Sequence, residues 1–168
     1  MNADVLIKLQ IDHNAWAIAR IIRTARALPA AGLEQDFGIG PGPLRETIAH
    51  MIGAMFIFAA NFDGGTMALP AEFETRSRTL DGLTSLLDEA SVRLSRAMLP
   101  FVQKADATTQ VRWPTAARGT LPAFFAIAQV FDHGAHHRAQ CKHMLKKLGV
   151  TALPDLDPLS FGSEQEHV

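Results

Sequence analysis

The stretch Leu121–Leu148, LPAFFAIAQVFDHGAHHRAQCKHMLKKL, sets the expectation for the fold. Thr120 is a natural N-cap just before it, and Pro122 falls in the first turn, where its missing N–H does no harm. Gly149 offers a left-handed cap at the far end, and nearby positive charge suits the negative pole of the helix dipole. Three lysines carry that charge: Lys142, Lys146 and Lys147. The stretch is therefore predicted to be one long helix.

Three further segments repeat apolar side chains every three or four residues, the spacing typical of amphipathic helices. They are about Asp4–Ala27, Leu44–Phe62 and Thr79–Phe101. Asp36–Pro43, rich in Gly and Pro, has the composition of a loop, and Gln103–Gly119 is expected to be irregular. Four such helices predict an all-α fold built as a four-helix bundle, with long connections before the third and fourth helices.

The 168 residues fit a single domain with a sizeable core. We expect a bundle domain over residues 1–150 and a loosely packed C-terminal tail over residues 151–168, which contains Pro154 and Pro158. Large apolar side chains at helical spacing are expected in the core, and they include Met51, Met55, Phe56, Phe124 and Phe125.

Charge and hydropathy limit the partners that the chain can take. Lys plus Arg number 16 and Asp plus Glu number 17, so no basic field is present to hold a nucleic acid. No apolar run approaches the ~20 residues that span a bilayer, so no membrane partner is expected. The first residues lack the pattern of a secretory signal, and the single cysteine, Cys141, suits a reducing compartment. A cytoplasmic protein that acts on a small molecule is the expectation.

Histidines are crowded in the last predicted helix. Of the 7 in the chain, four fall within a short stretch: His133, His136, His137 and His143. His133 and His137 are four residues apart, so both rings project from one helix face. His50 lies on the second predicted helix beside Gly53 and Ala54, small residues that permit another helix to approach. If these two helices face each other, three imidazoles can hold zinc or nickel and leave a position for water or substrate.

Spacing alone does not decide between this reading and a plainer one. Histidine pairs at this spacing also occur on surfaces, or in cores where they are hydrogen-bonded, and a lone His50 fits the same description. His136 points about a quarter-turn away from His137 and is expected to be a neighbour of the site. His143 and His167 are expected to be exposed.

A resemblance to a known family adds to this reading. The run His133-Gly-Ala-His-His137-Arg-Ala-Gln140, followed by Leu145 and by Leu148-Gly149, resembles the terminal motif of the DinB/YfiT-like family. The segment Leu44–Met51 is similar to that family's second-helix motif, and Asn14 with Trp16 resembles its opening helix, so the likeness spans about Met1–Gly149. Ala139 departs from the pattern, which has glycine there.

The resemblance implies a specific site and a fold. It places the metal ligands at His50, His133 and His137, in a four-helix bundle that is often a homodimer. The metal would be zinc, nickel or another divalent ion. It also implies a thiol-S-transferase type of reaction, in which a low-molecular-weight thiol held by the metal attacks an electrophile.

Several other residues have two expected roles each. Cys141 is a fourth ligand or, more commonly for a lone cysteine, a small buried hydrophobe. Glu46 orients the His50 ring, or is only an acid favoured in the first helical turn. His13, near Trp16, is the candidate catalytic residue, as a proton carrier or a substrate contact. Gln140 is expected near the face of His137. Arg138 is expected to reach a carboxylate or a helix end, or to have a structural role.

Two functions from different classes fit these features. The first is a metal-dependent enzyme, a thiol transferase or else a hydrolase, because a metal with an open position acidifies a bound thiol or water. The second is a non-catalytic protein of a stress response, in which the metal only joins two helices or holds a ligand. A closed fourth position would favour the second function, and a position open to a cleft would favour the first.

Overall fold

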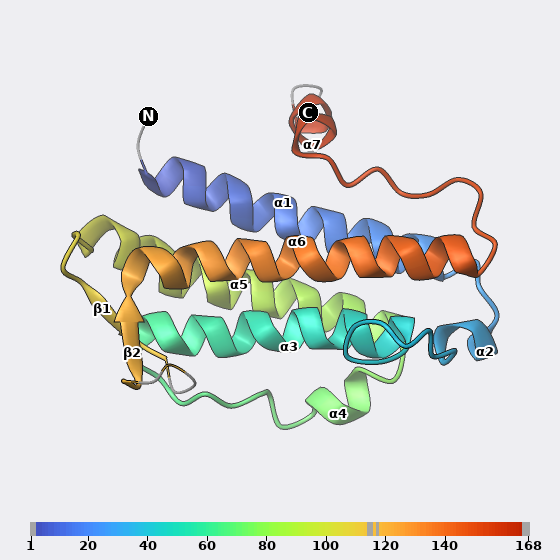
Figure 1. The fold of residues 1–168 in the computed structure, drawn as a ribbon, viewed down its shortest axis with the longest axis horizontal. Coiled ribbons are helices and arrows are strands. Elements are labelled where there is room, and N and C mark those ends of the chain that lie inside the picture. The colour runs from blue at the N-terminus through green and yellow to red at the C-terminus, as the bar shows by residue number, and fades with distance from the viewer. Residues whose placement is uncertain (1–2, 114–115, 117, 166–168) are drawn as a thin grey trace.

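The computed structural model describes residues 3–113, 116 and 118–165 (Figure 1). Four long helices make up most of it, and they are α1 (Ala3–Ala25), α3 (Leu44–Asp63), α5 (Leu80–Lys104) and α6 (Ala123–Lys147). Three short helices and two short strands complete the described part: α2 (Ala30–Leu33), α4 (Phe73–Arg76), α7 (Pro158–Gln165), β1 (Gln110–Arg112) and β2 (Thr120–Pro122). The predicted all-α class is confirmed, apart from this small hairpin.

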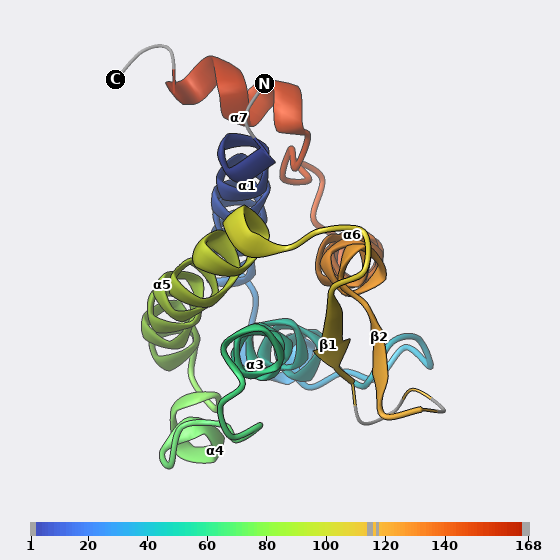
Figure 2. The same ribbon diagram turned by 90° about the vertical axis from the view of Figure 1, so that its left-hand side faces the viewer.

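The four long helices pack around a common core. Figure 2 shows them nearly end-on, with α1 and α3 each in contact with both α5 and α6. Fully buried side chains from every helix meet between them, such as Ile18 of α1, Ile52 of α3, Leu86 of α5 and Met144 of α6. Burial of such apolar side chains is the main stabilising contribution to a fold of this kind. The result is that one face of α3 is held against one face of α6.

Local signals explain where the helices begin and end. Thr79 caps α5, because its side-chain oxygen accepts a hydrogen bond from the Gly82 amide at 3.0 Å. Gly64 follows α3 with a positive φ of 72°, a conformation that favours glycine. The helices α1, α3 and α5 therefore begin and end close to their predicted positions.

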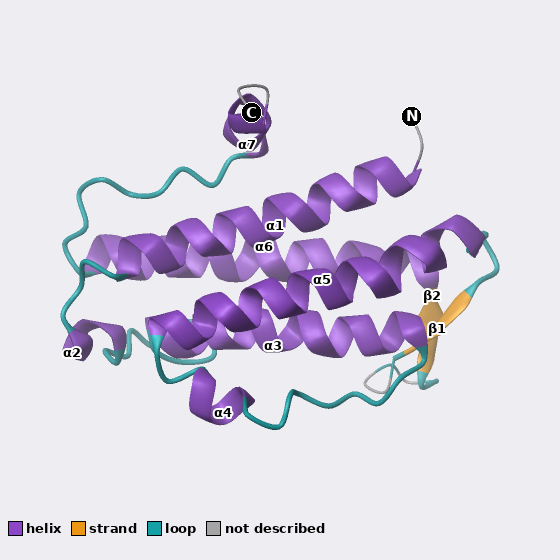
Figure 3. Cartoon of the chain, turned by 180° about the vertical axis from the view of Figure 1, so that it is seen from behind, coloured by secondary structure: helices purple, strands orange, loops and turns teal. Residues whose placement is uncertain are grey.

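The start of the last helix was predicted wrongly. Thr120 does not cap α6, and Pro122 does not lie in its first turn, because both belong to β2. This strand pairs antiparallel with β1, with Val111 opposite Leu121, and Val111 is buried. The hairpin lies at one end of the helices (Figure 3). Part of the segment expected to be irregular is thus a strand, and Phe124 and Phe125, expected in the core, are 55% and 58% exposed.

The C-terminal segment is more ordered than its composition suggested. Helix α7 lies beside α1, on the side away from α3 (Figures 1 and 2), and its Phe161 is buried near His13 and Trp16. Glu164 accepts hydrogen bonds from Trp16 at 2.8 Å and from Arg20 at 2.6 Å. Residues 166–168 of the predicted tail, and His167 with them, lie outside the described residues.

None of the helices formed by the described residues combines the length and the apolar character needed to cross a lipid bilayer.

Candidate metal centre

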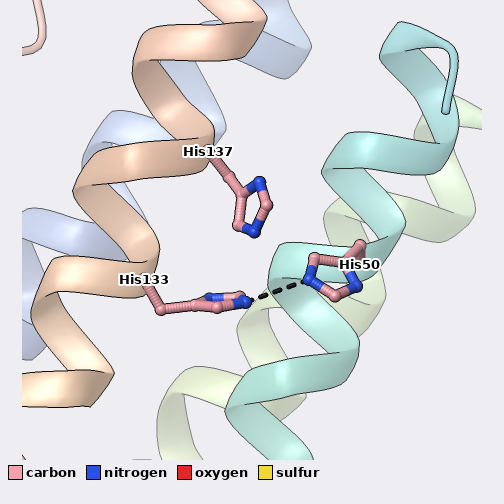
Figure 4. A group of neighbouring side chains, drawn as sticks. All are labelled: His50, His133 and His137. Atoms are coloured by element: carbon pink, nitrogen blue, oxygen red, sulfur yellow. Dashed lines mark hydrogen bonds between the residues drawn. The ribbon is translucent and has the colours of Figure 1, made fainter. Parts of the chain in front are cut away.

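Three histidines converge between α3 and α6 (Figure 4). His133 and His137 project from adjacent turns of α6, and His50 faces them from α3. Each ring offers one nitrogen, and these nitrogens all lie within 4.8 Å of one another. The Nε2 atoms of His50 and His133 are 3.0 Å apart. The contact between α3 and α6 therefore brings together the three residues that the sequence selected.

The ring of His133 is held in place by aromatic neighbours. Phe58, two turns after His50 on α3, packs edge-on against it with 5.4 Å between ring centroids. Trp113, which follows β1, stacks on Phe58 with 5.5 Å between ring centroids. This packing limits rotation of the His133 ring and fixes the direction of its nitrogens.

Burial favours the neutral form of two of these imidazoles. The pKa of His133 is lowered to about 4, mainly by burial and then by the nearby rings of His137, His50 and His136. The pKa of His50 is lowered by burial first and by His137 second. A neutral imidazole has the free lone pair that a metal requires, so both residues are ready to bind a cation at neutral pH. The donor set therefore fits a divalent transition metal.

Gln140 determines which nitrogen of His137 is free. Its side-chain Oε1 lies 2.7 Å from His137 Nδ1, and its Nε2 lies 3.0 Å from His136 Nε2. An amide oxygen only accepts hydrogen bonds, so His137 Nδ1 carries the proton and its Nε2 keeps a free lone pair. Partners of this kind orient the ligands of metal sites.

The loop before α3 packs against the side chain of Gln140. Gly40 has a positive φ of 69°, and a Cβ added there would lie 2.8 Å from Gln140 Oε1. Thr47, one turn into α3, donates its hydroxyl to the Gly42 carbonyl at 3.0 Å and so fastens the loop to the helix. Gly40, which the sequence suggested only as a loop residue, therefore packs directly against Gln140.

Replacing Gln140 by leucine should weaken metal binding while the fold is kept. The variant loses the acceptor that holds the His137 tautomer, and losses of this kind cost roughly 10–100-fold in metal affinity. Competition with a chromogenic chelator measures the effect. Gln140→Glu is the matched control, because its carboxylate can still accept from His137 Nδ1. Equal metal affinity of the parent and Gln140→Leu would contradict the role of Gln140 in orienting His137.

A large cavity opens beside the histidines. Its volume is about 980 Å³, and His50 and His133 form part of its wall. Apolar side chains line much of the rest, among them Ala54, Ile57, Phe58, Leu69, Phe73 and Trp113. A metal held by the three nitrogens would thus stand at the wall of a space large enough for a small-molecule substrate.

In comparison with known protein families, the model of the DinB family matches residues 1–165 of the chain. The chain belongs to the DinB family. This match extends beyond the Met1–Gly149 likeness seen in the sequence and takes in α7. No curated protein matches the chain.

Two further residues of α6 in this DinB chain, Arg138 and Ala139, lie outside the tripod. Arg138 donates a hydrogen bond to Asn14 Oδ1 and so links α6 to α1, which agrees with the structural one of its two expected roles. Ala139, where the family pattern has glycine, is exposed on α6, so no close helix contact there depends on that glycine.

Cys141 and Glu46 take the plainer of their two expected roles. Cys141 is fully buried, and burial raises the pKa of its thiol to about 12, so it stays protonated as a small apolar side chain. Glu46 is exposed, and its carboxylate lies 3.7 Å from Arg45 Nη2. Among the described residues, the only group of three or more close enough for a metal is His50, His133 and His137.

His13 lies away from the tripod. It is buried on α1, its Nε2 is 2.9 Å from the Leu156 carbonyl oxygen, and its ring packs near Trp16 and Phe161. It is not among the described residues that line the cavity beside His50. The candidate catalytic histidine thus contacts the C-terminal segment of the DinB chain instead. His143 is exposed, as expected.

Proposed function

We propose that this chain is a metal-dependent enzyme that transfers a low-molecular-weight thiol to an electrophilic small molecule. In this proposal His50, His133 and His137 hold one zinc or nickel ion within the four-helix bundle typical of the family. The observation that carries it is the position of the three histidines, two of which, His50 and His133, form part of the wall of a cavity of about 980 Å³.

The reaction would join the thiol sulfur to an electrophilic carbon, and the leaving group would depart with the electron pair of the broken bond. When bound, the metal supplies the positive charge that lowers the pKa of a thiol toward neutrality. The chain itself contributes three functions. His50, His133 and His137 bind the cation, Gln140 keeps the His137 lone pair free, and the wall of Phe58 and Trp113 restricts water on one side.

The alternative is a metal that only joins α3 to α6. A structural site needs a fourth protein ligand that closes the coordination sphere. Cys141 was the expected candidate, but among the described residues it does not belong to the group whose ligand atoms lie within 4.8 Å of one another. His50, in contrast, is exposed to the cavity. These two observations favour an open position, and therefore catalysis.

The test is a survey of small thiols against electrophilic acceptors, with the protein loaded with zinc or nickel. We expect loss of free thiol that requires both metal and protein, and that is abolished in His50→Ala. The His143→Ala variant removes an exposed histidine from the same protein and should keep the activity. Metal binding without turnover in any combination would overturn the enzyme proposal and leave the structural or ligand-binding role.

A further inference from the structure

One of the two guanidiniums in the cavity wall, that of Arg45, is engaged within the protein. Arg45 lies in its wall, but Nε and Nη2 of this residue are both bound to the Glu34 carboxylate, the latter at 2.8 Å. The remaining nitrogen, Nη1, donates to the Ser77 carbonyl at 3.3 Å. Each of the three guanidinium nitrogens therefore already donates to a partner within the protein, and the charge of Arg45 is paired with that of Glu34.

The remaining charges do not favour an anion either. The described cavity wall holds three carboxylates, from Glu34, Glu46 and Glu74, and two guanidiniums, from Arg45 and Arg78. Apart from the histidines, these side chains therefore carry one more negative charge than positive. Arg78 has a carboxylate, Glu74, in the same wall. A ligand with a negative charge would meet net repulsion and would lose solvation on entering.

The wall next to the histidines is apolar and built from aromatic rings. Phe58 touches His133 on one edge and stacks on Trp113, with an angle of 17° between the ring planes. Phe73 is another ring of the cavity wall. Gly53 allows it to pack against α3, since a Cβ at Gly53 would lie 3.2 Å from the Phe73 ring. Such surfaces bind flat apolar molecules through area burial and ring stacking.

We propose that this cavity binds an uncharged, mainly apolar molecule with an aromatic ring, seated between the Phe58–Trp113 wall and Phe73. Its role as the electrophile that receives the thiol rests on the proposed function. Its binding does not, because the walls are formed without metal or thiol. Selectivity for neutral over anionic molecules follows from the excess of carboxylates and from the engaged Arg45.

Tryptophan fluorescence gives a direct measurement of this binding. The chain has 2 tryptophans and no tyrosine, so Trp16→Phe leaves Trp113, in the cavity wall, as the single strong fluorophore. The probes are para-bromobenzamide and para-bromobenzoate, which match in size, differ in charge, and quench fluorescence through the bromine atom. The protein is used free of metal, so that no cation attracts the carboxylate.

We expect saturable quenching of Trp113 by the neutral amide, with an affinity at least about tenfold above that of the anion. Ala54→Phe fills the cavity from α3 and should abolish saturable quenching. Ala139→Phe makes the same substitution at an exposed position of α6 and should leave it unchanged. Glu74→Gln should reduce the difference in affinity between the neutral amide and the anion.

Three results would overturn the proposal. They are equal or tighter binding of the anion, quenching that does not saturate, and unchanged binding in Ala54→Phe. Circular dichroism of each variant identifies loss of folding, and Ala54→Leu then provides a smaller filling substitution. Since neither metal nor thiol is present, failure here does not bear on the transfer assay. Likewise, absence of turnover with intact binding would count against the proposed function alone.

Discussion

Saturating zinc or nickel is expected to raise the melting temperature of the metal-free protein by roughly 8–16 °C. The three ligands come from α3 and α6, and they converge only in the folded chain. A ligand at about a thousand times its dissociation constant, bound only by the folded state, stabilises it by about 4 kcal/mol. In a domain of this size each kcal/mol moves the melting temperature by about 2–4 °C. Differential scanning calorimetry with and without metal measures the shift.

Two histidine variants make this measurement specific. His133→Ala removes one of the three ligand nitrogens and should lose nearly all of the shift. His143→Ala, on the exposed side of the same helix, should keep it. A shift of equal size in both variants would mean that the metal binds elsewhere. Loss of cooperative unfolding on chelation would point to a structural metal, since such a site contributes directly to folding.

Gly134→Val should be the most destabilising single substitution close to the site. Gly134 lies where α6 crosses α1, and a Cβ there would be 2.9 Å from Arg138 Nη1 and closer still to Asn14 Oδ1. Valine would separate these two groups, break their charge-assisted hydrogen bond, and leave the buried Asn14 oxygen without it. Overpacking together with this loss should cost roughly 3 kcal/mol.

Urea denaturation of the metal-free protein measures this cost. Ala135→Val, one residue further along and exposed, carries the helix-propensity effect of valine without the clash. It should cost less than about 1 kcal/mol. Equal stability of the two variants would contradict the close contact between α1 and α6 at Gly134.

The helices and the metal ligands could be predicted because their signals are local or periodic. Apolar spacing identified the buried faces of α3 and α5, and a four-residue interval placed His133 and His137 on one side of α6. His50 needed more than spacing, because a lone histidine on a helix has several roles. The family likeness supplied that residue, and the contact of α3 with α6 accounts for it.

The hairpin and α7 could not be predicted in the same way. Thr120 and Pro122 have the chemistry of a helix start, and only pairing with Gln110–Arg112 makes them a strand. Helix α7 is short, and its position depends on Phe161 and on the bonds of Glu164 to α1. Such contacts join residues far apart in the chain, where periodicity gives no information.

The cavity wall and the support of the ligands also depend on distant contacts. Phe58 and Trp113 come from α3 and from the end of β1, and no motif connects them. Gln140 was expected near His137. The loop around Gly40, which packs on Gln140, lies in a stretch that was predicted only to be a loop, from its glycines and prolines. The sequence could therefore name the metal ligands but not the surface that selects a substrate.

The central claim is that one divalent ion is bound by His50, His133 and His137. Elemental analysis of protein purified without added metal tests it most directly, on the parent, on His50→Ala and His137→Ala, and on His143→Ala as the control. The account predicts near one equivalent of zinc or nickel in the parent and the control, and little in the other two. Metal retained at parental level by His50→Ala or His137→Ala would contradict it.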